Sequence, residues 1–525
     1  MANAKSKNTK YWASHGPKLF SLNSTEAPLS RREDCPFWEW VSQGWALVIL
    51  ALFPLMIGPR TYYNITVTKY ITYVVLTCLY MVACVVIGLI YRPGKRVGRN
   101  MRERWDQKLT LPQILLMAYV LWALISTIAS PYTKLWVGQS RYEGMFSILL
   151  YAAAFLLLSF WGEYTDAYAY GLGIMGAVIG CIALIQTFGS TFLYPDDYNY
   201  RNVRFLTTIG NVDCVAGIVN VLIPLLLAAF VILRSKRRYI CLPGLFFMTY
   251  LMRVMDVDTA KVGFAAVAVL LPCFIQSRDR LGKLLVGFSP ILAGYALGAA
   301  WQWDTPLAFG RTSWVCFAAA VVFAALGWLM GRGDRVWKVS PALVRRVGYV
   351  FIVILIMIAM VLIYGYEGEN KLLNEASAFM HGELADSAGS NRGYLWKSTA
   401  KLIKENPILG GGPGSFYSLF IPYNDMDRFG VRFDFPHNDF LNIGACTGLV
   451  GLVLYLAFLI ALALRCIKAA RRSQVIVILM AGMMGYLVYS FFVFSIAIVS
   501  PLFWVMAGLA DKCVRQTEQH NALTA

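Results

Sequence analysis

The sequence is organised around residues 386–451, which read SNRGYLW at 390–396, NPILGGGPGSF at 406–416 and PHNDFL at 436–441. This stretch runs from a polar loop through an amphipathic segment, a glycine turn and a second polar loop to a histidine and an apolar segment. Residues 367–436 form the one long polar excursion in a largely apolar chain. Long loops on a rigid scaffold often carry function, so we expect the candidate site here.

Apolar runs of about 20 residues recur along nearly the whole chain, a length that lets a helix cross a membrane. Of the 525 residues, 58% are hydrophobic and only 14% are charged, compared with about 25% charged in an average soluble protein. Helices satisfy their own backbone polar groups in lipid. The sequence therefore predicts an all-α polytopic membrane protein with about 12–14 transmembrane helices and one large extracytoplasmic loop that contains amphipathic helices.

Fourteen candidate spans can be placed along the sequence. They begin near residues 41, 70, 110, 144, 168, 212, 239, 259, 282, 312, 347, 438, 474 and 499. The seventh (239–252) and the last (499–509) are shorter than a membrane-crossing helix normally is.

Basic residues are concentrated in alternate connections between these spans. Seven segments hold 31 of the 47 Lys and Arg residues: the N-terminal tail, 92–108, 234–238, 278–283, 332–346, 465–472 and the C-terminal tail. The positive-inside rule places that side in the cytoplasm. The formal net charge of +18 is then explained by membrane topology and by basic residues that contact anionic lipid headgroups. This explanation argues against nucleic acid as a partner.

This alternation divides the chain into five parts. We expect a cytoplasmic basic tail (1–37), transmembrane helices 1–11 (38–366), a large extracytoplasmic loop (367–436), helices 12–14 (437–510) and a cytoplasmic tail (511–525). Both termini are then cytoplasmic in a multi-pass plasma-membrane protein. No signal peptide is evident. The short outside loops carry isolated arginines: Arg141, Arg201, Arg204, Arg253 and Arg311.

The eleven cysteines are scattered singly, with none in the large loop and no CxxC pair. A disulfide framework or a zinc site is therefore not expected. The outside face offers only His381 and His437 and no compact acidic cluster. The sequence thus predicts neither a metal nor another cofactor.

His437 is a candidate general base because it follows Pro436 and precedes a helix that Asn438 or Asp439 can cap. The positive end of a helix dipole disfavours an imidazolium, so the ring should stay neutral and able to accept a proton. The alternative is a histidine that only forms a hydrogen bond at the membrane interface.

Arg392 is a candidate phosphate ligand on a predicted helix over 391–405. It shares one helix face with Trp396, Thr399 and Ile403. A guanidinium on a mostly apolar face needs a partner, and its planar fork suits a phosphate. The alternative is a structural salt bridge with Glu383 or Asp386.

Several further residues are candidates with a simpler structural alternative. Lys261 and Arg141 lie at outer helix ends, as anion ligands or as interfacial anchors. Asn211 lies at the outer start of the sixth span, either in the site or as a cap. Residues 410–414 either cradle a phosphate through backbone amides or form the turn that ends the Arg392 helix.

Together these elements resemble the O-antigen ligase/O-antigen polymerase superfamily of bacterial membrane glycosyltransferases. The matching elements are an Arg-x-x-x-Trp helix (Arg392, Trp396), an Asn-Pro-Gly turn (Asn406, Pro407, Gly410, Gly412, Gly414, Phe416) and a His-Asn-x-x-Leu element (His437, Asn438, Leu441). Weaker matches are residues 141–144 and 210–213. Members commonly carry Ser-Arg-Gly where this sequence reads Ala260-Lys261-Val262. Lysine keeps the charge but loses the bidentate geometry.

The resemblance implies a metal-independent, inverting glycosyltransferase of the integral-membrane C type. The donor would be a glycan on undecaprenyl diphosphate, and the acceptor a glycan, a lipid or a protein. His437 and Arg392 would be catalytic, as general base and diphosphate ligand. The substrate-binding residues would be Lys261, Arg141, Asn438, Asn211 and Trp396.

The sequence leaves two alternatives open. A ligase and a polymerase differ only in the acceptor, and no motif separates them. A transporter or flippase for lipid-linked oligosaccharides would also need cations at the outer leaflet. That class would more often show internal repeats or polar residues within several spans, which this sequence does not clearly have.

Overall fold

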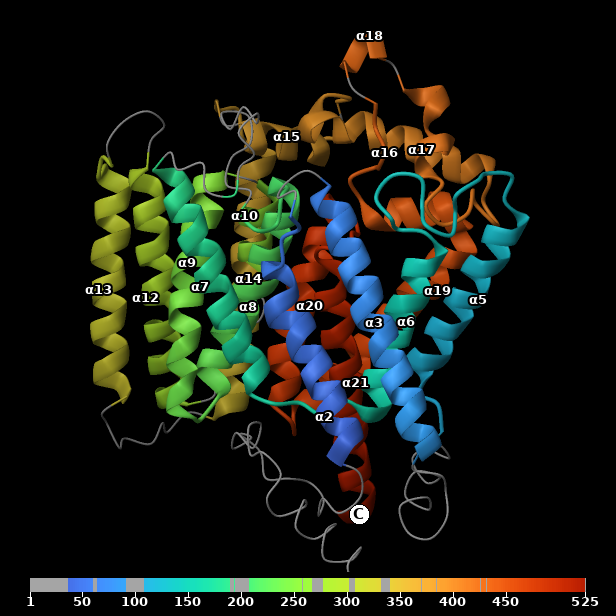
Figure 1. The fold of residues 1–525 in the computed structure, drawn as a ribbon. Helices are drawn as coiled ribbons and strands as arrows, with labels where there is room; N and C mark the ends of the chain where they lie inside the picture. The colour runs from blue at the N-terminus through green and yellow to red at the C-terminus, as the bar shows by residue number, and fades with distance from the viewer. Residues whose placement is uncertain are drawn as a thin grey trace, which may run out of the picture.

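The protein is a bundle of long helices with a layer of short helices across one end (Figure 1). The computed structural model describes residues 36–59, 64–90, 108–188, 193, 207–256, 258–266, 277–301, 307–331, 340–369, 371–383, 385–424, 426–430 and 432–524. Helices α15 (Lys371–Met380), α16 (Ala388–Glu405), α17 (Phe416–Leu419) and α18 (Met426–Phe429) form the layer. The C terminus lies at the opposite end of the bundle.

The bundle contains a helix at each of the fourteen predicted spans. They are α2 (Pro36–Leu47), α3 (Ile65–Ile90), α5 (Leu111–Ala129), α6 (Met145–Trp161), α7 (Ala167–Thr187), α8 (Val212–Ile232), α9 (Cys241–Met255), α10 (Asp258–Ala266), α12 (Arg278–Ala300), α13 (Arg311–Gly331), α14 (Pro341–Tyr364), α19 (Asp439–Ala470), α20 (Val475–Phe492) and α21 (Ser500–Thr524).

Ten of these helices are long and apolar enough to cross a membrane, counted over the described residues. The exceptions are α6, α9 and α10, which are shorter, and α21, whose second half is polar. All described regular elements are helical, so the predicted all-α polytopic class is confirmed. The last span, predicted as short, continues as helix through most of the predicted C-terminal tail.

The core of the bundle is α8, which is buried along its whole length from Cys214 to Ile232. It packs against α9 and α20, while α5 packs against α19 and α6 against α21. In contrast, α14 buries none of its apolar span within the protein. A helix that is apolar all round and unburied by protein fits a position surrounded by lipid.

The first span is broken near its C-terminal end. After α2 the chain forms a π-helix, η2 (Val48–Leu52), and a 3₁₀ turn, η3 (Phe53–Leu55), which contains Pro54. Lys69 of α3 is fully buried, and its Nζ donates to the carbonyl oxygen of Pro54 (2.9 Å). Carbonyl groups at a helix C-terminus carry partial negative charge, so this lysine stabilises the break.

Helix α16 confirms the predicted helix over 391–405. Gly389, Ser390 and Asn391 have positive φ angles of 59°, 58° and 72°, so the regular helix begins after Asn391 and ends at Glu405. Its buried face includes Thr399 and, less completely, Ile403. The layer helix therefore lies with its predicted apolar face toward the bundle.

Helix α19 is interrupted at Gly448, and the glycine turn 407–412 inserts into the break. Gly448 has φ 70° and ψ 178°, and a Cβ there would lie 2.0 Å from the carbonyl oxygen of Ile408. Three backbone N–H groups bridge the segments: Leu449 to Pro407 O (2.7 Å), Gly411 to Ala445 O (3.1 Å) and Gly412 to Cys446 O (2.7 Å). The turn thus replaces hydrogen bonds that an unbroken helix would make internally.

Candidate active site

His437 lies in a tight turn where the large loop meets α19. Its φ of 49° is left-handed, and the following Asn438 caps the helix by accepting a hydrogen bond from Leu441 N–H (2.9 Å). Trp396 of α16 donates its indole N–H to the carbonyl oxygen of Pro436 (3.1 Å). The helix cap and the indole therefore hold the backbone on both sides of the histidine.

The His437 ring is partly buried against Phe494, with ring centroids 5.5 Å apart. Its Nδ1 is buried without a hydrogen-bond partner among the described residues. Burial lowers the pKa of His437 from its ordinary value to about 4; Asp213 opposes this shift, and Arg392 and Arg141 add to it. The imidazole is therefore neutral at physiological pH, and its Nδ1 accepts no hydrogen bond from the described residues.

Arg392 binds backbone carbonyl groups and no carboxylate within the described part of the chain. Its Nε donates to Phe492 O (3.1 Å) and its Nη1 to Gly389 O (2.9 Å). Burial lowers the pKa of the guanidinium, and the charges of Asp213 and Asp258 oppose that effect. Since a guanidinium stays protonated in proteins, this positive charge remains available to an anion.

The salt-bridge alternative for Arg392 is not what the structure shows. Asp386 instead contacts Lys397 (3.1 Å) and Arg428 (2.9 Å) at the surface of the layer. The hydrogen bonds from these two cations lower the pKa of the Asp386 carboxyl group.

Arg141 lies beside the same histidine but is already paired. Its Nε and Nη2 bind the two carboxylate oxygens of Asp434 at 2.9 and 3.0 Å, and its guanidinium carbon lies 3.9 Å from the centre of the Phe494 ring. A bidentate pair of this kind fixes geometry as well as charge. Arg141 thus anchors the segment that leads into His437.

The other two predicted substrate residues have local partners. Lys261 of α10 contacts Asp256 (3.0 Å) and Asp258 (2.9 Å) with 42% of its side chain exposed. Asn211 caps α8 by accepting from the N–H groups of Asp213 (2.8 Å) and Cys214 (3.3 Å). The structure therefore brings together His437, Arg392 and Arg141, whereas Asn211 and Lys261 form their hydrogen bonds and ion pairs with other described residues.

The glycine turn uses two of its amides inside the protein. The N–H groups of Gly411 and Gly412 donate to carbonyl groups of α19, which leaves neither for a phosphate. The structure thus favours the turn interpretation of residues 410–414 over a phosphate cradle. His381, the other histidine predicted to face the outside, stacks on Tyr364 with ring centroids 4.0 Å apart, and its Nδ1 lies 2.8 Å from Ser377 O.

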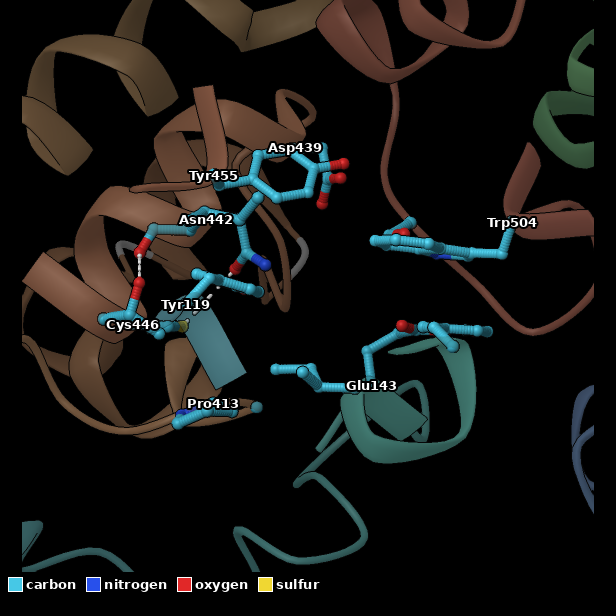
Figure 2. Close-up of a pocket in the computed structure, with 14 residues that line it drawn as sticks. Tyr119, Glu143, Pro413, Asp439, Asn442, Cys446, Tyr455 and Trp504 are labelled. Carbon is cyan, nitrogen blue, oxygen red and sulfur yellow. Dashed lines mark hydrogen bonds between the residues drawn. The ribbon is translucent and has the colours of Figure 1, made fainter. Parts of the chain in front are cut away.

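A cavity of about 60 Å³ lies between α5, α6, α19 and α21, beside the start of α19. Figure 2 shows Asp439 and Tyr455 on one side of this space and Glu143 on another. Glu143 accepts a hydrogen bond from Tyr151 Oη (2.8 Å), and burial raises the pKa of its carboxyl group well above the ordinary value.

Sequence reasoning missed Asp434, Glu143 and Asp439 as site residues. Glu143 follows Arg141 by two residues in a motif that the resemblance includes. Asp439 is a carboxylate at the start of an apolar span, where an ionisable group is a functional candidate by default. Asp434 gives a weaker signal, an acid between Phe433 and Phe435 shortly before the histidine.

The residues around Arg392 and His437 lie in a segment that matches a known protein family. Residues 305–456 match the family model described as O-antigen ligase. The chain carries an O-antigen ligase domain. The superfamily resemblance seen in the motifs is thereby confirmed, and no curated protein matches the sequence.

The O-antigen ligase domain contains four of the predicted site residues: Arg392, Trp396, His437 and Asn438. The other three, Arg141, Asn211 and Lys261, precede it in the chain. The domain indicates a glycosyltransferase of the O-antigen ligase or polymerase type, which uses lipid-linked glycans. With ten candidate spans, the protein is a multi-pass membrane protein, and the family indicates the bacterial inner membrane.

Proposed function

We propose that this protein transfers a glycan from undecaprenyl diphosphate to an acceptor hydroxyl group on the outer face of the cytoplasmic membrane. The observation that carries the proposal is the neutral, unpartnered imidazole of His437 beside the carbonyl-anchored guanidinium of Arg392. A base and an anion-binding cation at one membrane-proximal site suit displacement of a diphosphate by a hydroxyl group.

In the proposed reaction His437 removes the proton of the acceptor hydroxyl group as its oxygen attacks the anomeric carbon. The bond between that carbon and the diphosphate oxygen breaks, and undecaprenyl diphosphate leaves with the electron pair. A direct displacement of this kind inverts the anomeric configuration. Arg392 stabilises the negative charge that develops on the leaving group, and Trp396 positions the histidine through the Pro436 carbonyl group.

Arg141 and Lys261 are proposed as secondary ligands of the diphosphate. Both are paired with carboxylates in the structure, so a phosphate oxygen would have to exchange with Asp434 or with Asp256 and Asp258. The exposed Lys261 pairs are weak in water, which makes that exchange easy. Asn438 and Asn211 are assigned to helix capping next to the site.

We further propose that the reaction needs no divalent metal and that the layer α15–α18 faces the outside. Among the described residues, no group of three or more His, Cys, Asp or Glu side chains is arranged to hold a metal ion. The orientation rests on the basic connections at the other side. An impermeant thiol reagent should therefore label a cysteine at Lys404, but not one at Lys236, in cells without an outer-membrane barrier.

The ligase and polymerase alternatives are separated by the products. Purified protein would be given an undecaprenyl-diphosphate oligosaccharide and candidate acceptors, and the glycans analysed. A ladder on the lipid indicates a polymerase, and a single transfer to a new acceptor indicates a ligase. Movement of the intact lipid-linked glycan across a liposome bilayer, with no new glycosidic bond, would instead establish the transporter alternative.

A further inference from the structure

The cavity beside α19 carries two hydroxyl groups that have no partner. Tyr119 and Tyr455 are each 95% buried and line the cavity, and their rings pack with centroids 5.4 Å apart. Neither hydroxyl group forms a hydrogen bond within the described residues. A buried phenol normally finds a partner, so these two hydroxyl groups are available to a hydrogen-bonding group that enters the cavity.

The other polar groups of the cavity complement those phenols. The carboxyl groups of Glu143 and Asp439 and the amide of Asn442 line it, and Asp439 is buried. Carboxyl oxygens accept hydrogen bonds, and phenols donate them. A ligand group that both donates and accepts, such as an alcohol, matches this set.

Charge separates this cavity from the diphosphate-binding cluster. Arg392 and Arg141 lie beside His437, whereas no lysine or arginine lines the cavity. A diphosphate would meet carboxyl oxygens there and no cation, which is unfavourable for an anion. The cavity therefore suits a neutral group rather than the diphosphate.

The size of the cavity limits what enters it. An engineered cavity of about 150 Å³ holds one benzene ring, whereas this one is about 60 Å³. It admits a hydroxyl-bearing arm of a sugar or a few water molecules, and not a whole sugar ring. Pro413 and Gly414 of the loop also line it, so it adjoins the layer in which the large loop lies.

We propose that this cavity is the acceptor subsite, in which Tyr119, Tyr455, Glu143 and Asp439 bind a hydroxyl-bearing arm of the acceptor sugar. The proposal rests on the proposed transferase function. It adds that the acceptor is recognised through its sugar, at the start of α19, while the cations bind the donor. The subsite orients the acceptor so that another of its hydroxyl groups faces His437.

A native cysteine reports on occupancy without requiring turnover. Cys446 lines the cavity, whereas Cys466, also on α19 and also buried, does not. The full-length protein would be treated with methyl methanethiosulfonate at alkaline pH, with or without methyl hexosides and methyl N-acetylhexosaminides. Mass spectrometry then gives the modification rate at each cysteine in one sample.

The subsite predicts that at least one glycoside slows modification of Cys446 and leaves Cys466 unchanged. At about three times the dissociation constant, full blocking by the ligand gives about a fourfold decrease. Tyr455→Phe should raise that dissociation constant about 2- to 10-fold, as expected for one neutral hydrogen bond. Tyr73→Phe is the matched control, because this buried hydroxyl is also unpartnered but lies outside the cavity.

Three results would overturn the subsite: no reaction of Cys446, equal rates with and without every glycoside, or the same protection by cyclohexanol. Retention of wild-type affinity by both Tyr455→Phe and Tyr119→Phe would do the same. None of these results bears on His437, because the readout does not depend on transfer. Conversely, an inactive His437 variant in which the glycosides still protect Cys446 would support the subsite independently of transfer.

Discussion

Arg141 and Asp434 are joined by two parallel hydrogen bonds of 2.9 and 3.0 Å, although 293 positions separate them in the sequence. The pair connects the loop between α5 and α6 to the segment that ends in His437. Both side chains are about three-quarters buried, so solvent screens this pair less than an exposed one. The position of the histidine therefore depends on it.

We expect Asp434→Asn to lower turnover about tenfold, because hydrogen bonds between charged groups contribute about 1.5–3 kcal/mol. The affinity for the donor should stay the same or increase, since the change frees Arg141 for a phosphate. Asp386→Asn is the control: its contacts with Lys397 and Arg428 are exposed and contribute little. Steady-state kinetics at matched protein levels checks both, and equal effects of the two variants would refute the anchoring role.

His437→Ala should lower transfer about 10²–10⁴-fold, the usual contribution of a general base. Donor binding should persist, because the diphosphate is assigned to Arg392. His381→Ala is the matched control, since that ring stacks on Tyr364 away from the cluster. Normal turnover by the His437 variant would mean that another group is the base, and loss of donor binding would make the histidine a ligand.

Activity should fall as the pH drops through the pKa of His437, since only the neutral imidazole accepts a proton. Burial lowers this pKa to about 4 in the free protein, and Arg392 and Arg141 add to the shift. A bound diphosphate offsets those positive charges and raises the pKa. The acidic limb of kcat/KM for the donor should thus lie at lower pH than the limb of kcat. A kcat/KM limb near 6.5, the unperturbed value, would contradict the buried site.

Arg392→Lys should reduce kcat about 100-fold, as removal of one transition-state hydrogen-bond donor commonly does. A lysine keeps the charge, but it cannot bind two carbonyl groups and a phosphate through one planar group. Arg428→Lys makes the same change at an exposed arginine and should leave kcat unchanged. Expression and kcat measured together separate a catalytic from a folding defect, and wild-type kcat would refute the role of the guanidinium fork.

Gly448→Ala should destabilise the protein by more than about 2 kcal/mol. The backbone is left-handed there, and the added Cβ would lie 2.0 Å from Ile408 O. Gly331→Ala meets nothing within 4 Å and serves as the control. The Tm of each purified variant in detergent measures the difference. A stable Gly448→Ala protein would mean that the turn and α19 can separate without cost.

Local features of this protein could be predicted from sequence because they depend on neighbouring residues. The apolar runs predict the helix positions, the pattern of residues 391–405 predicts α16, and Asn438 was one of two expected caps of α19. Contacts between distant segments were not accessible in this way. Neither the Arg141–Asp434 pair nor the cavity with its two free phenols has a periodic signature, since each depends on how helices pack.

The break at Gly448 was also beyond local reasoning, for a different reason. From sequence alone, the glycines after His437 (Gly444, Gly448 and Gly451) are best interpreted as sites of close helix packing. The left-handed φ becomes favourable only when the turn 407–412 supplies backbone partners. A sequence pattern reports that a glycine is present, but not which distant carbonyl group approaches it.

The insertion of the turn 407–412 into α19 has a mechanical consequence. The part of α19 before Gly448 directly follows the turn that holds His437, and α16 carries Arg392 and leads directly into the turn 407–412. A tilt of the part of α19 before Gly448 therefore moves α16 as well, so the imidazole of His437 and the guanidinium of Arg392 move together as one rigid unit. If the site opens for substrate exchange, the movement must therefore come from other segments. The distance between His437 and Arg392 then stays the same in the open and closed states.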